Sequence, residues 1–418
     1  MIDKSKLVPV VADPGGPWVL ETGTPELLVE IRDAVHRFAA DVMRPVGAEL
    51  DKLTPEEVIA PGSPLYEVHK KYWDLGTEAL QELPPEQALL GTCYLAEEIG
   101  WGDAGLAISI GLDGMIASLG NQMGMPEIAE RYHNKRISAW AVTEPDHGSD
   151  MLDSLREVFG AGGSYGRPNC VVRRQGNEIV IRGQKSAWVS NGVVAEQAML
   201  FAAYDNGKDD GLFQGCVVTL PLDVKGVSRG KPLNKMGQRA LPQGEIFFDE
   251  VRLPAEHLAV EPDRYHEAVS KTLTGANAGM GLIFAGVARA AFEHALEYAH
   301  ERRQGGVPII QHQSVRARLF KMWRRVEMAR ALGRRVFMRN ALGPQPVLHA
   351  AIAAKVTSTE IAFEVASDAV QMFGGNGVSR EYPVEKILRD ARASMIEDGC
   401  NEFLSIKGGS QLVDFSRF

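Results

Sequence analysis

Cysteine, long apolar runs and blocks of like charge are all scarce in this chain, and each shortage excludes a class of protein. The four cysteines among the 418 residues, Cys93, Cys170, Cys216 and Cys400, are scattered and form no CxxC pair. This spacing argues against a disulfide framework or a zinc site and fits a reducing compartment. The ten histidines show no HExxH or other ligand spacing, so we expect no metal.

No apolar run is long enough to cross a membrane, and the first residues have neither a signal-peptide core nor a transit-peptide composition. The net charge of −9, the pI near 5.7 and the lack of a Lys/Arg block argue against nucleic acid as a partner. An apolar content of 45% and a charged content of 24% are ordinary for a globular protein. We therefore expect a cytoplasmic enzyme of two or three domains that does not bind membranes.

The first third of the chain has a helical pattern. After a Pro- and Gly-rich lead-in over residues 1–23, a helix is expected with Thr24 as N-cap and Pro25 in its first turn. Leu28 and Val35 belong to its apolar face at helical spacing. Further helices are predicted over residues 66–80, 85–99, 104–122 and 126–132. An all-α N-terminal domain is expected over residues 1–137.

From residue 137 the chain changes to short apolar or alternating segments broken by Gly, Asn and Asp, a pattern typical of antiparallel strands. The predicted strands cover residues 139–143, 178–182, 198–204, 215–220 and 244–248, within a β-barrel-like middle domain over 138–256. Long helices are then predicted over 268–302, 313–342, 347–373 and 384–396. Their short connections indicate a C-terminal four-helix bundle over 257–418. The expected fold class is α+β.

The stretch MIEDGCNE near the C-terminus is the first candidate for chemistry. Asp398 precedes Gly399, and a glycine lets the backbone approach a ligand closely because it has no Cβ. A carboxylate in such a place is suited to remove a proton. An Asp-Gly pair taken alone is more often a turn, so the catalytic interpretation depends on other motifs.

Two loops of the β region are suited to hold a flat or charged ligand. In WAVTEPDHGSD, Thr143 and Ser149 place hydroxyls where backbone N–H groups are also free, and such loops bind a ring edge or a phosphate. In GQKSAWVSNG, Trp188 offers a flat face and Ser190 follows on the same side of an expected strand. The ordinary alternatives are a core aromatic for Trp188 and a turn hydroxyl for Thr143.

These loops belong to an ordered series of motifs. The series is WAVTEPDHGSD (140–150), GQKSAWVSNG (183–192), KMGQR (235–239) with FDEVRLP (248–254), YAHERR (298–303) with PI (308–309) and HQ (312–313), QMFGGNG (371–377) with EYPVE (381–385) and RDA (389–391), and MIEDGCNE (395–402). In this order, and over residues 25–410, the series resembles the acyl-CoA dehydrogenase family. One such motif would be a weak signal, whereas the ordered set is specific.

The resemblance implies FAD as the cofactor and an acyl-CoA as the substrate. Val142 and Thr143 would bond the pyrimidine side of the isoalloxazine ring, Trp188 would pack on it, and Ser190 would lie near N5. The other residues implied on this side of the cofactor are Trp140, Gly148, Ser149, Val189, Cys400 and Glu402. The residues implied at the substrate are Ser149, Asn277, Asp113 and Gly399.

The resemblance also implies that the cofactor site is shared between subunits. Arg302, Gln313, Gln371, Gly374 and Gly375 would reach the FAD of a neighbouring subunit, with Arg302 on its pyrophosphate, which suits a planar cation. The site then needs at least a dimer, and the family commonly forms homotetramers. Electrons would leave through an electron-transfer flavoprotein. The alternative for Arg302 is a solvated helix end.

The implied reaction is α,β-dehydrogenation, in which Asp398 removes the pro-R α-proton while the β-hydride passes to flavin N5. The enolate oxygen would be stabilised by the backbone N–H of Asp398 and a ribityl hydroxyl. Some relatives carry the base on the first bundle helix, where this chain has Ala276, and the adjoining arginine is replaced by Asn277. Most relatives have Glu at the place of Asp398. Aspartate there resembles the dehydrogenases of alicyclic acyl-CoAs, such as cyclohexane- or cyclohexenecarboxyl-CoA.

Several departures from the family pattern leave more than one interpretation open. Glu397 stands where many relatives have a pocket tyrosine, and it either faces solvent or adds a polar contact. Asp113, expected in an apolar helix, either pairs structurally or takes a proton from a distant ring carbon in a 1,4-elimination. Residues 156–169 look inserted, as a solvated loop, a cover over the CoA entrance or a subunit contact. Gly305 and Gly306 stand where relatives have an aromatic and a glycine, so the aromatic near the adenine is missing.

Two rival functions remain at this point. A relative of the same fold with other chemistry would be a monooxygenase, or would eliminate or decarboxylate an acyl-CoA. A monooxygenase usually lacks the carboxylate before Gly399, so Asp398 favours a dehydrogenase. The second rival is a member without catalysis that serves in binding or assembly.

Overall fold

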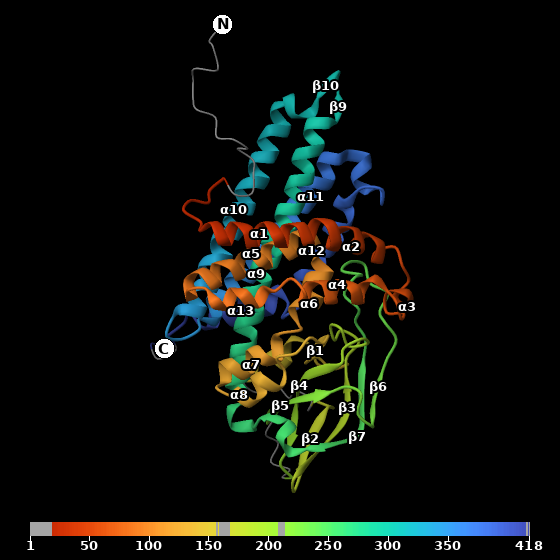
Figure 1. Cartoon of the computed structure of the whole chain (residues 1–418), viewed down its shortest axis with the longest axis vertical. Coiled ribbons are helices and arrows are strands. Elements are labelled where there is room, and N and C mark those ends of the chain that lie inside the picture. The colour runs from red at the N-terminus through yellow and green to blue at the C-terminus, as the bar shows by residue number, and fades with distance from the viewer. Residues whose placement is uncertain (1–18, 156–157, 159–167, 208–213, 415–416, 418) are drawn as a thin grey trace.

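The structure, a computed structural model, describes residues 19–155, 158, 168–207, 214–414 and 417. Most of the lead-in over 1–23 and most of the apparent insertion at 156–169 lie outside these residues. Most of the N-terminal helices lie across the middle of a long bundle, and the β-sheet lies at one end of that bundle (Figure 1). A two-stranded hairpin marks the opposite end. The predicted α+β class and the order helices, sheet, bundle are confirmed.

The N-terminal region is helical, as predicted. Its α-helices are α1 (Glu26–Phe38), α2 (Arg44–Leu50), α3 (Pro55–Val58), α4 (Pro64–Trp73), α5 (Pro85–Gly102), α6 (Ala104–Gly111), α7 (Met115–Met123) and α8 (Pro126–Arg131). A π-helical segment, Ala39–Met43, joins α1 to α2 without a break. The apolar face predicted for the first helix is buried, including Leu28 and Val35.

Several predicted helix limits were wrong. Thr24 is not the N-cap of α1, because Pro25 holds that position and no side chain caps the helix. The helix predicted to reach residue 80 ends at Trp73, since Gly76 at φ +68° takes the chain into the left-handed region. The helix predicted over residues 104–122 is two helices, α6 and α7, bent by 47°.

The middle region is an eight-stranded sheet in the order β6-β7-β3-β2-β4-β5-β8, with β1 paired to β4. Its strands are β1 (Ser138–Ala141), β2 (Val171–Gln175), β3 (Glu178–Lys185), β4 (Gln197–Asp205), β5 (Gly215–Pro221), β6 (Val227–Arg229), β7 (Ile246–Pro254) and β8 (Leu258–Val260). The sheet is not purely antiparallel as predicted, because β1 and β2 both run parallel to β4. The short strands β2, β6 and β8 were not predicted.

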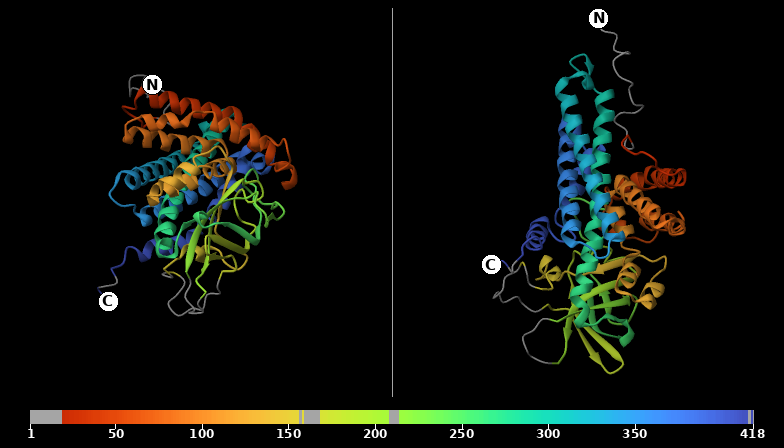
Figure 2. Two further views of the ribbon diagram at one scale, coloured as in Figure 1. Left: turned by 60° about the horizontal axis from the view of Figure 1, so that its bottom comes forward. Right: turned by 90° about the vertical axis from the view of Figure 1, so that its left-hand side faces the viewer.

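The C-terminal region is the predicted bundle with an added helix. Its helices are α9 (Tyr265–Glu301), α10 (Gln313–Leu342), α11 (Leu348–Phe373) and α12 (Pro383–Ser394), followed by α13 (Asn401–Ser410). Helices α9, α10 and α11 run side by side for most of their length (Figure 2). The hairpin β9 (Arg303–Gln304) and β10 (Val307–Pro308) connects α9 to α10. Helix α13 was missed; Gly408 and Gly409 lower its helix propensity.

Helix α5 crosses α9 at very short range, which ties the N-terminal region to the bundle. A Cβ on Gly286 of α9 would lie 2.0 Å from the carbonyl oxygen of Glu97. A Cβ on Gly100 of α5 would lie 2.1 Å from the carbonyl oxygen of Ile283. Each helix therefore needs a glycine where the backbones meet.

No single helix among the described residues has the length and apolar character needed to cross a membrane. Helices α6 and α7 meet that criterion only when taken together as a bent pair.

Candidate active site

The centre of the candidate site is the turn between α12 and α13 that carries Asp398. Asp398 has φ +54° and Gly399 has φ +90°. The left-handed conformation of Asp398 costs free energy, because residues other than glycine are strained there. The side-chain amide of Asn277 donates to the carbonyl of Asp398 at 3.3 Å. The ammonium of Lys355 donates to the carbonyl of Gly399 at 2.9 Å. Two helices of the bundle thus hold the strained turn.

A third contact joins the turn to the sheet region. The backbone N–H of Cys400 donates to Ser149 Oγ at 3.2 Å. Two residues predicted for the same site from opposite parts of the sequence therefore meet. Among the described residues, the backbone N–H of Asp398 makes no hydrogen bond within the chain.

The carboxyl groups of Asp398 and Glu397 lie in surroundings that favour their neutral forms. Burial raises the pKa of Asp398, and the charge of Lys355 opposes this shift. Burial and the charge of Asp398 together raise the pKa of Glu397 to about 7, against the hydrogen bond from Gln238. Glu397 is not a solvent-facing side chain: its Oε1 accepts from Gln238 Nε2 at 2.6 Å.

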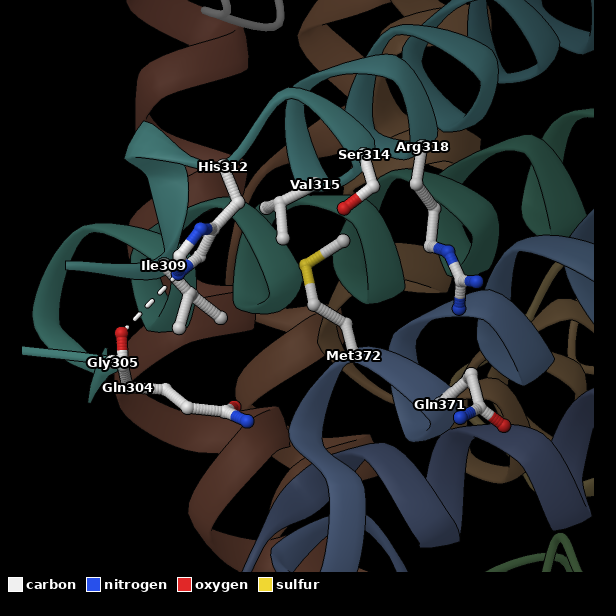
Figure 3. A pocket seen from close by; sticks show the side chains of 9 residues that line it. All are labelled: Gln304, Gly305, Ile309, His312, Ser314, Val315, Arg318, Gln371 and Met372. Atoms are coloured by element: carbon white, nitrogen blue, oxygen red, sulfur yellow. Dashed lines mark hydrogen bonds between the residues drawn. The ribbon is translucent and has the colours of Figure 1, made fainter. Parts of the chain in front are cut away.

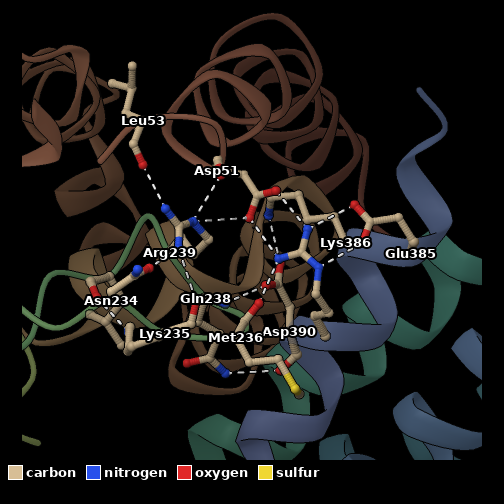
Figure 4. Close-up of polar contacts among 12 residues, drawn as sticks. Asp51, Leu53, Asn234, Lys235, Met236, Gln238, Arg239, Glu385, Lys386 and Asp390 are labelled. Carbon is tan, nitrogen blue, oxygen red and sulfur yellow. Dashed lines mark hydrogen bonds and ion pairs between the residues drawn. The ribbon is translucent and has the colours of Figure 1, made fainter. Parts of the chain in front are cut away.

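Gln238, which bonds to Glu397 of this turn, also belongs to a network of ion pairs (Figure 4). Its backbone N–H donates to the Asp390 carboxylate, and its Nε2 also donates to the carbonyl of Asp390 at 3.2 Å. Lys386 pairs with Asp390 at 2.6 Å and with Asp103 of the N-terminal region. Gln238 itself has φ +50°. Three regions of the chain therefore meet directly behind the turn.

A buried ion pair fixes the backbone of the first predicted ligand loop. Lys185 donates to the carbonyl of Val142 at 2.8 Å and to Glu144 Oε1 at 2.7 Å, with both charged side chains fully buried. The hydroxyls of Thr143 and Ser186 lie 2.6 Å apart. Val142 and Thr143 thus sit on a fixed backbone beside the loop that follows β3.

The second predicted loop differs from the expectation in one respect. Strand β3 ends at Lys185, so Trp188 lies in a turn and Ser190 in an isolated bridge to Gln243, and the two do not share one face of a strand. Gln243 fixes this turn, because its Nε2 donates to the carbonyl of Trp188 at 3.0 Å and to Ser190 Oγ at 3.1 Å. The indole of Trp188 is 62% exposed, so it is not a core aromatic. An exposed flat face beside Val189 and Thr143 is suited to stack on a planar ring.

Two buried polar atoms near these loops have no partner within the described part of the chain. They are Trp140 Nε1 and Asn277 Oδ1. Trp140 packs edge-on against Phe201 of β4. A buried donor and a buried acceptor without partners are expected where a ligand supplies the missing groups.

Residues predicted for the neighbouring subunit's cofactor lie at the opposite end of the bundle. A cavity of 490 Å³ is lined there by Gly305, His312, Arg318 and Gln371, among others (Figure 3). Arg302 caps α9 beside it and is exposed. Asn277, which contacts Asp398, is separated from this end by about 37 Å of α9 at a rise of about 1.5 Å per residue. The two groups of predicted residues therefore do not form one site within a single chain.

Gln313, Gly374 and Gly375 flank the same end. Gln313 begins α10, directly after His312 of the cavity wall. Gly374, with φ +60°, and Gly375 follow the end of α11 and its Gln371. Gly148 lies beside Ser149 in the first loop, with its N–H bonded to Asp150 at 2.7 Å. Glu402 is exposed on α13.

Asp113 has structural partners. It lies in the turn between α6 and α7, not within a helix as predicted. Its Oδ2 lies 2.8 Å from His69 Nδ1 and accepts from Trp73 Nε1 at 3.0 Å, and its Oδ1 accepts from the Ser138 N–H at 3.3 Å. These bonds, in a buried setting, fit the structural interpretation of this residue and account for the break between the helices.

Comparisons with known proteins agree with this architecture. The family model for the acyl-CoA dehydrogenase middle domain matches residues 139–251, and the model for the acyl-CoA dehydrogenase C-terminal domain matches residues 266–408. The chain is 30% identical over 334 residues to a short-chain specific acyl-CoA dehydrogenase of Megasphaera elsdenii, covering 78% of this chain and 82% of that protein. The chain belongs to the acyl-CoA dehydrogenase family.

Other relatives support the same membership. Cyclohexane-1-carbonyl-CoA dehydrogenase of Geobacter metallireducens is 28% identical over 392 residues, which cover 89% of this chain and 93% of that protein. The solved structure of butyryl-CoA dehydrogenase from Megasphaera elsdenii superposes with a TM-score of 0.80 at 25% identity, covering 94% of this chain and 100% of that one. As an acyl-CoA dehydrogenase, the chain is a flavoprotein oxidoreductase that acts on an acyl-CoA.

Several residues around the turn were not predicted from the sequence. Lys355, Gln238 and Asn401 all contact it or its neighbours. Gln238 and Asn401 lie within the stretches KMGQR and MIEDGCNE but were not predicted as site residues, and Lys355 lies in no motif. A usable signal existed for Lys355, because it is the one charged residue among the buried residues of α11. Gln238 was marked only by its place in the KMGQR stretch.

Proposed function

We propose that this acyl-CoA dehydrogenase oxidises its substrate between Cα and Cβ, with FAD as the cofactor and Asp398 as the base. The observation that carries the proposal is the turn at Asp398. Its strained backbone is held by Asn277, Lys355 and Ser149, whose contacts come from two helices and from the first ligand loop. Strain that the surroundings maintain in this way is concentrated at functional sites.

Asp398 would take the α-proton of the thioester through its carboxylate. The raised pKa suits this role, because a base works best when its pKa lies near the working pH. The N–H of Asp398, which bonds to no described group of the chain, is available to the thioester oxygen as negative charge develops there. One residue would then both remove the proton and stabilise the resulting charge.

The loops beside the turn suit a flavin. Val142 and Thr143 would hold the pyrimidine edge, the exposed indole of Trp188 would cover the ring, and Ser190 would lie near its N5. The unpartnered Trp140 Nε1 gives a further donor in the same region. Bound there, FAD would supply the acceptor for the hydride from Cβ. Gly148, Ser149, Val189, Cys400 and Glu402 complete the set proposed for this side of the cofactor.

The cavity at the other end of the bundle would serve the FAD of a neighbouring subunit. Arg302 would bind its pyrophosphate, with Gln313, Gln371, Gly374 and Gly375 alongside. The separation of about 37 Å along α9 supports this division, because one chain cannot bring both ends to one reaction centre. The active form would be at least a dimer, commonly a homotetramer in this family, and an electron-transfer flavoprotein would accept the electrons.

We further propose an alicyclic or branched acyl group. Aspartate is one methylene shorter than glutamate, so the α-carbon must lie close to the backbone of the turn. The relative from Geobacter metallireducens named cyclohexane-1-carbonyl-CoA dehydrogenase is consistent with this substrate class. Gly399 and Asn277 would lie nearest to the thioester, and Asp113 is left to its structural role.

The substrate and the base can be tested in one series. Straight, branched and cyclic acyl-CoAs are mixed with the FAD-loaded protein under anaerobic conditions, and flavin bleaching is recorded for each. We expect cyclohexanecarboxyl-CoA or its cyclohexene analogue to bleach the flavin fastest. In a dye-linked assay, Asp398→Asn should lose turnover, and retained turnover would end the proposed role of Asp398.

A further inference from the structure

Lys355 is unusual among the buried lysines of this protein. The lysines buried in the described part of the chain are Lys185, Lys355 and Lys407. Lys185 pairs with Glu144 at 2.7 Å, and Lys407 lies 3.4 Å from Asp153. The ammonium of Lys355 is fully buried and has no carboxylate of the described residues within ion-pair distance. A buried charge without a counter-ion is costly and is kept only where other groups compensate it.

The groups that compensate Lys355 belong to the turn at Asp398 and to Asn401, the first residue of α13. Its Nζ donates to the carbonyl of Gly399 at 2.9 Å and to Asn401 Oδ1 at 2.8 Å. Asn401 Nδ2 donates to Thr359 Oγ1 at 3.1 Å, and that hydroxyl donates to the carbonyl of Lys355 at 2.9 Å. The side chain of Asn401 is thus fixed from α11, and the ammonium has one defined position.

We propose that Lys355 is a positioning residue of this enzyme, which holds the Asp398–Gly399 turn through the carbonyl of Gly399 and places a buried positive charge behind the base. The inference deepens the proposed function and rests on Asp398 being the base. The ammonium of Lys355 reaches the turn from α11 and bonds to its backbone. It can therefore hold the base in place without touching the substrate.

The charges around the turn give the direction in which the pKa of Asp398 should change when Lys355 is replaced. Burial raises the pKa of Asp398, and Lys355 is the charge that opposes this rise. Lys355 in turn has its pKa lowered to about 8 by burial, against the charges of Asp398, Glu397, Cys400 and Glu402. The charge of Lys235 opposes the rise in the pKa of Glu397, which is bonded to Gln238. Removing the cation removes the opposition, so the pKa of Asp398 should rise.

The test measures the rate of anaerobic flavin bleaching against pH for the wild-type holoenzyme and for K355Q and K355M. The probe is whichever of butyryl-CoA and cyclohexanecarboxyl-CoA bleaches the wild-type flavin faster. Because the rate needs an ionised base, the acid limb should move to higher pH by about one unit, which is about a tenfold lower rate on that limb. The K355R protein keeps the cation and should keep the wild-type acid limb. The control K407M removes a buried lysine that pairs with Asp153, and its acid limb should stay in place.

A second readout does not depend on turnover. Amide hydrogen exchange of a peptide covering residues 395–402 should be faster in K355M and K355Q than in K407M, since the carbonyl of Gly399 has lost its donor.

If the neutral variants do not fold, the pH profile of K355R is compared with that of the wild type. An acid limb displaced by a unit in K355R would overturn the proposal. An unmoved acid limb in K355Q, with wild-type exchange of this peptide, would also overturn it. If D398N bleaches like the wild type, the proposed function fails; if D398N is inactive and the Lys355 variants keep their profile, only this inference fails.

Discussion

The backbone N–H of Cys400 donates a hydrogen bond of 3.2 Å to Ser149 Oγ, although the two residues are far apart in the sequence. This bond connects the turn that carries Asp398 with the loop that contains Val142 and Thr143. This hydroxyl group therefore links the proposed base directly to the proposed flavin loop.

Replacing Ser149 by alanine should weaken this connection without unfolding the protein. A single hydrogen bond of this kind contributes about 1 kcal/mol, so the flavin-bleaching rate should fall by up to about fivefold. Ser154→Ala is the matched control, because Ser154 Oγ bonds to His266 Nδ1 at 2.9 Å at an exposed position. Equal rates in the two variants would show that the Ser149 bond does not position the base.

Glu397 should make the protein less stable as pH rises. Burial raises its folded pKa to about 7, above its ordinary value of 4.5, so the folded state binds a proton more tightly than the unfolded state. The associated stability is present below about pH 4.5 and is lost as the pH rises through about 7. Glu397→Gln should remove this dependence, and urea unfolding at pH 5 and pH 8 would measure it. Glu402→Gln, at an exposed position of α13, should unfold with the pH dependence of the wild type.

The crossing of α5 and α9 predicts a strong contrast between two glycines of one helix. A Cβ at Gly286 would meet the carbonyl of Glu97 at 2.0 Å, whereas a Cβ at Gly279 meets nothing within 4 Å. Gly286→Ala should therefore lower the free energy of unfolding by about 2 kcal/mol or more. Gly279→Ala should leave it unchanged or raise it by up to about 1 kcal/mol, since alanine favours a helix. Thermal unfolding of both variants checks this, and similar melting temperatures would contradict the close approach.

Arg302→Ala should weaken FAD binding while leaving the reaction centre of the same chain intact. Losing a charged hydrogen bond to a pyrophosphate costs about 1.5 kcal/mol or more, which is about a tenfold higher Kd. Titration of the deflavinated variant with FAD measures this. Arg303→Ala is the control, because Arg303 donates to the carbonyl of Gly306 within its own hairpin at 2.7 Å. A wild-type affinity in the Arg302 variant would refute the proposed contact with the neighbouring cofactor.

The long elements could be predicted from the sequence because their patterns are strong. The limits of α10 matched the prediction, since its apolar residues recur at helical spacing between a Gly-Gly-containing hairpin and Gly343. The break between α6 and α7 could not be predicted, because it depends on His69 and Trp73 reaching Asp113 from another helix. The parallel pairing of β1 and β2 with β4 is likewise a tertiary choice that no local pattern encodes.

For the site, the motifs identified the residues that face a ligand better than those that hold them. Asp398, Ser149 and Asn277 were predicted, and the structure brings them together. Lys355 and Gln238 were not predicted, because their contacts, to the carbonyl of Gly399 and to the side chain of Glu397, are tertiary contacts that no local pattern encodes.

The most direct test of the central claim is rapid mixing of the Asp398→Asn holoenzyme with the best acyl-CoA substrate in the absence of oxygen. The variant keeps the backbone N–H and the size of the side chain but cannot accept the α-proton. We expect the acyl-CoA to bind, seen as a shift of the flavin spectrum, while bleaching slows by at least about a thousandfold, within the range that loss of a positioned general base produces. Bleaching at the wild-type rate in this variant, with Ser154→Ala as an active control, would contradict the account.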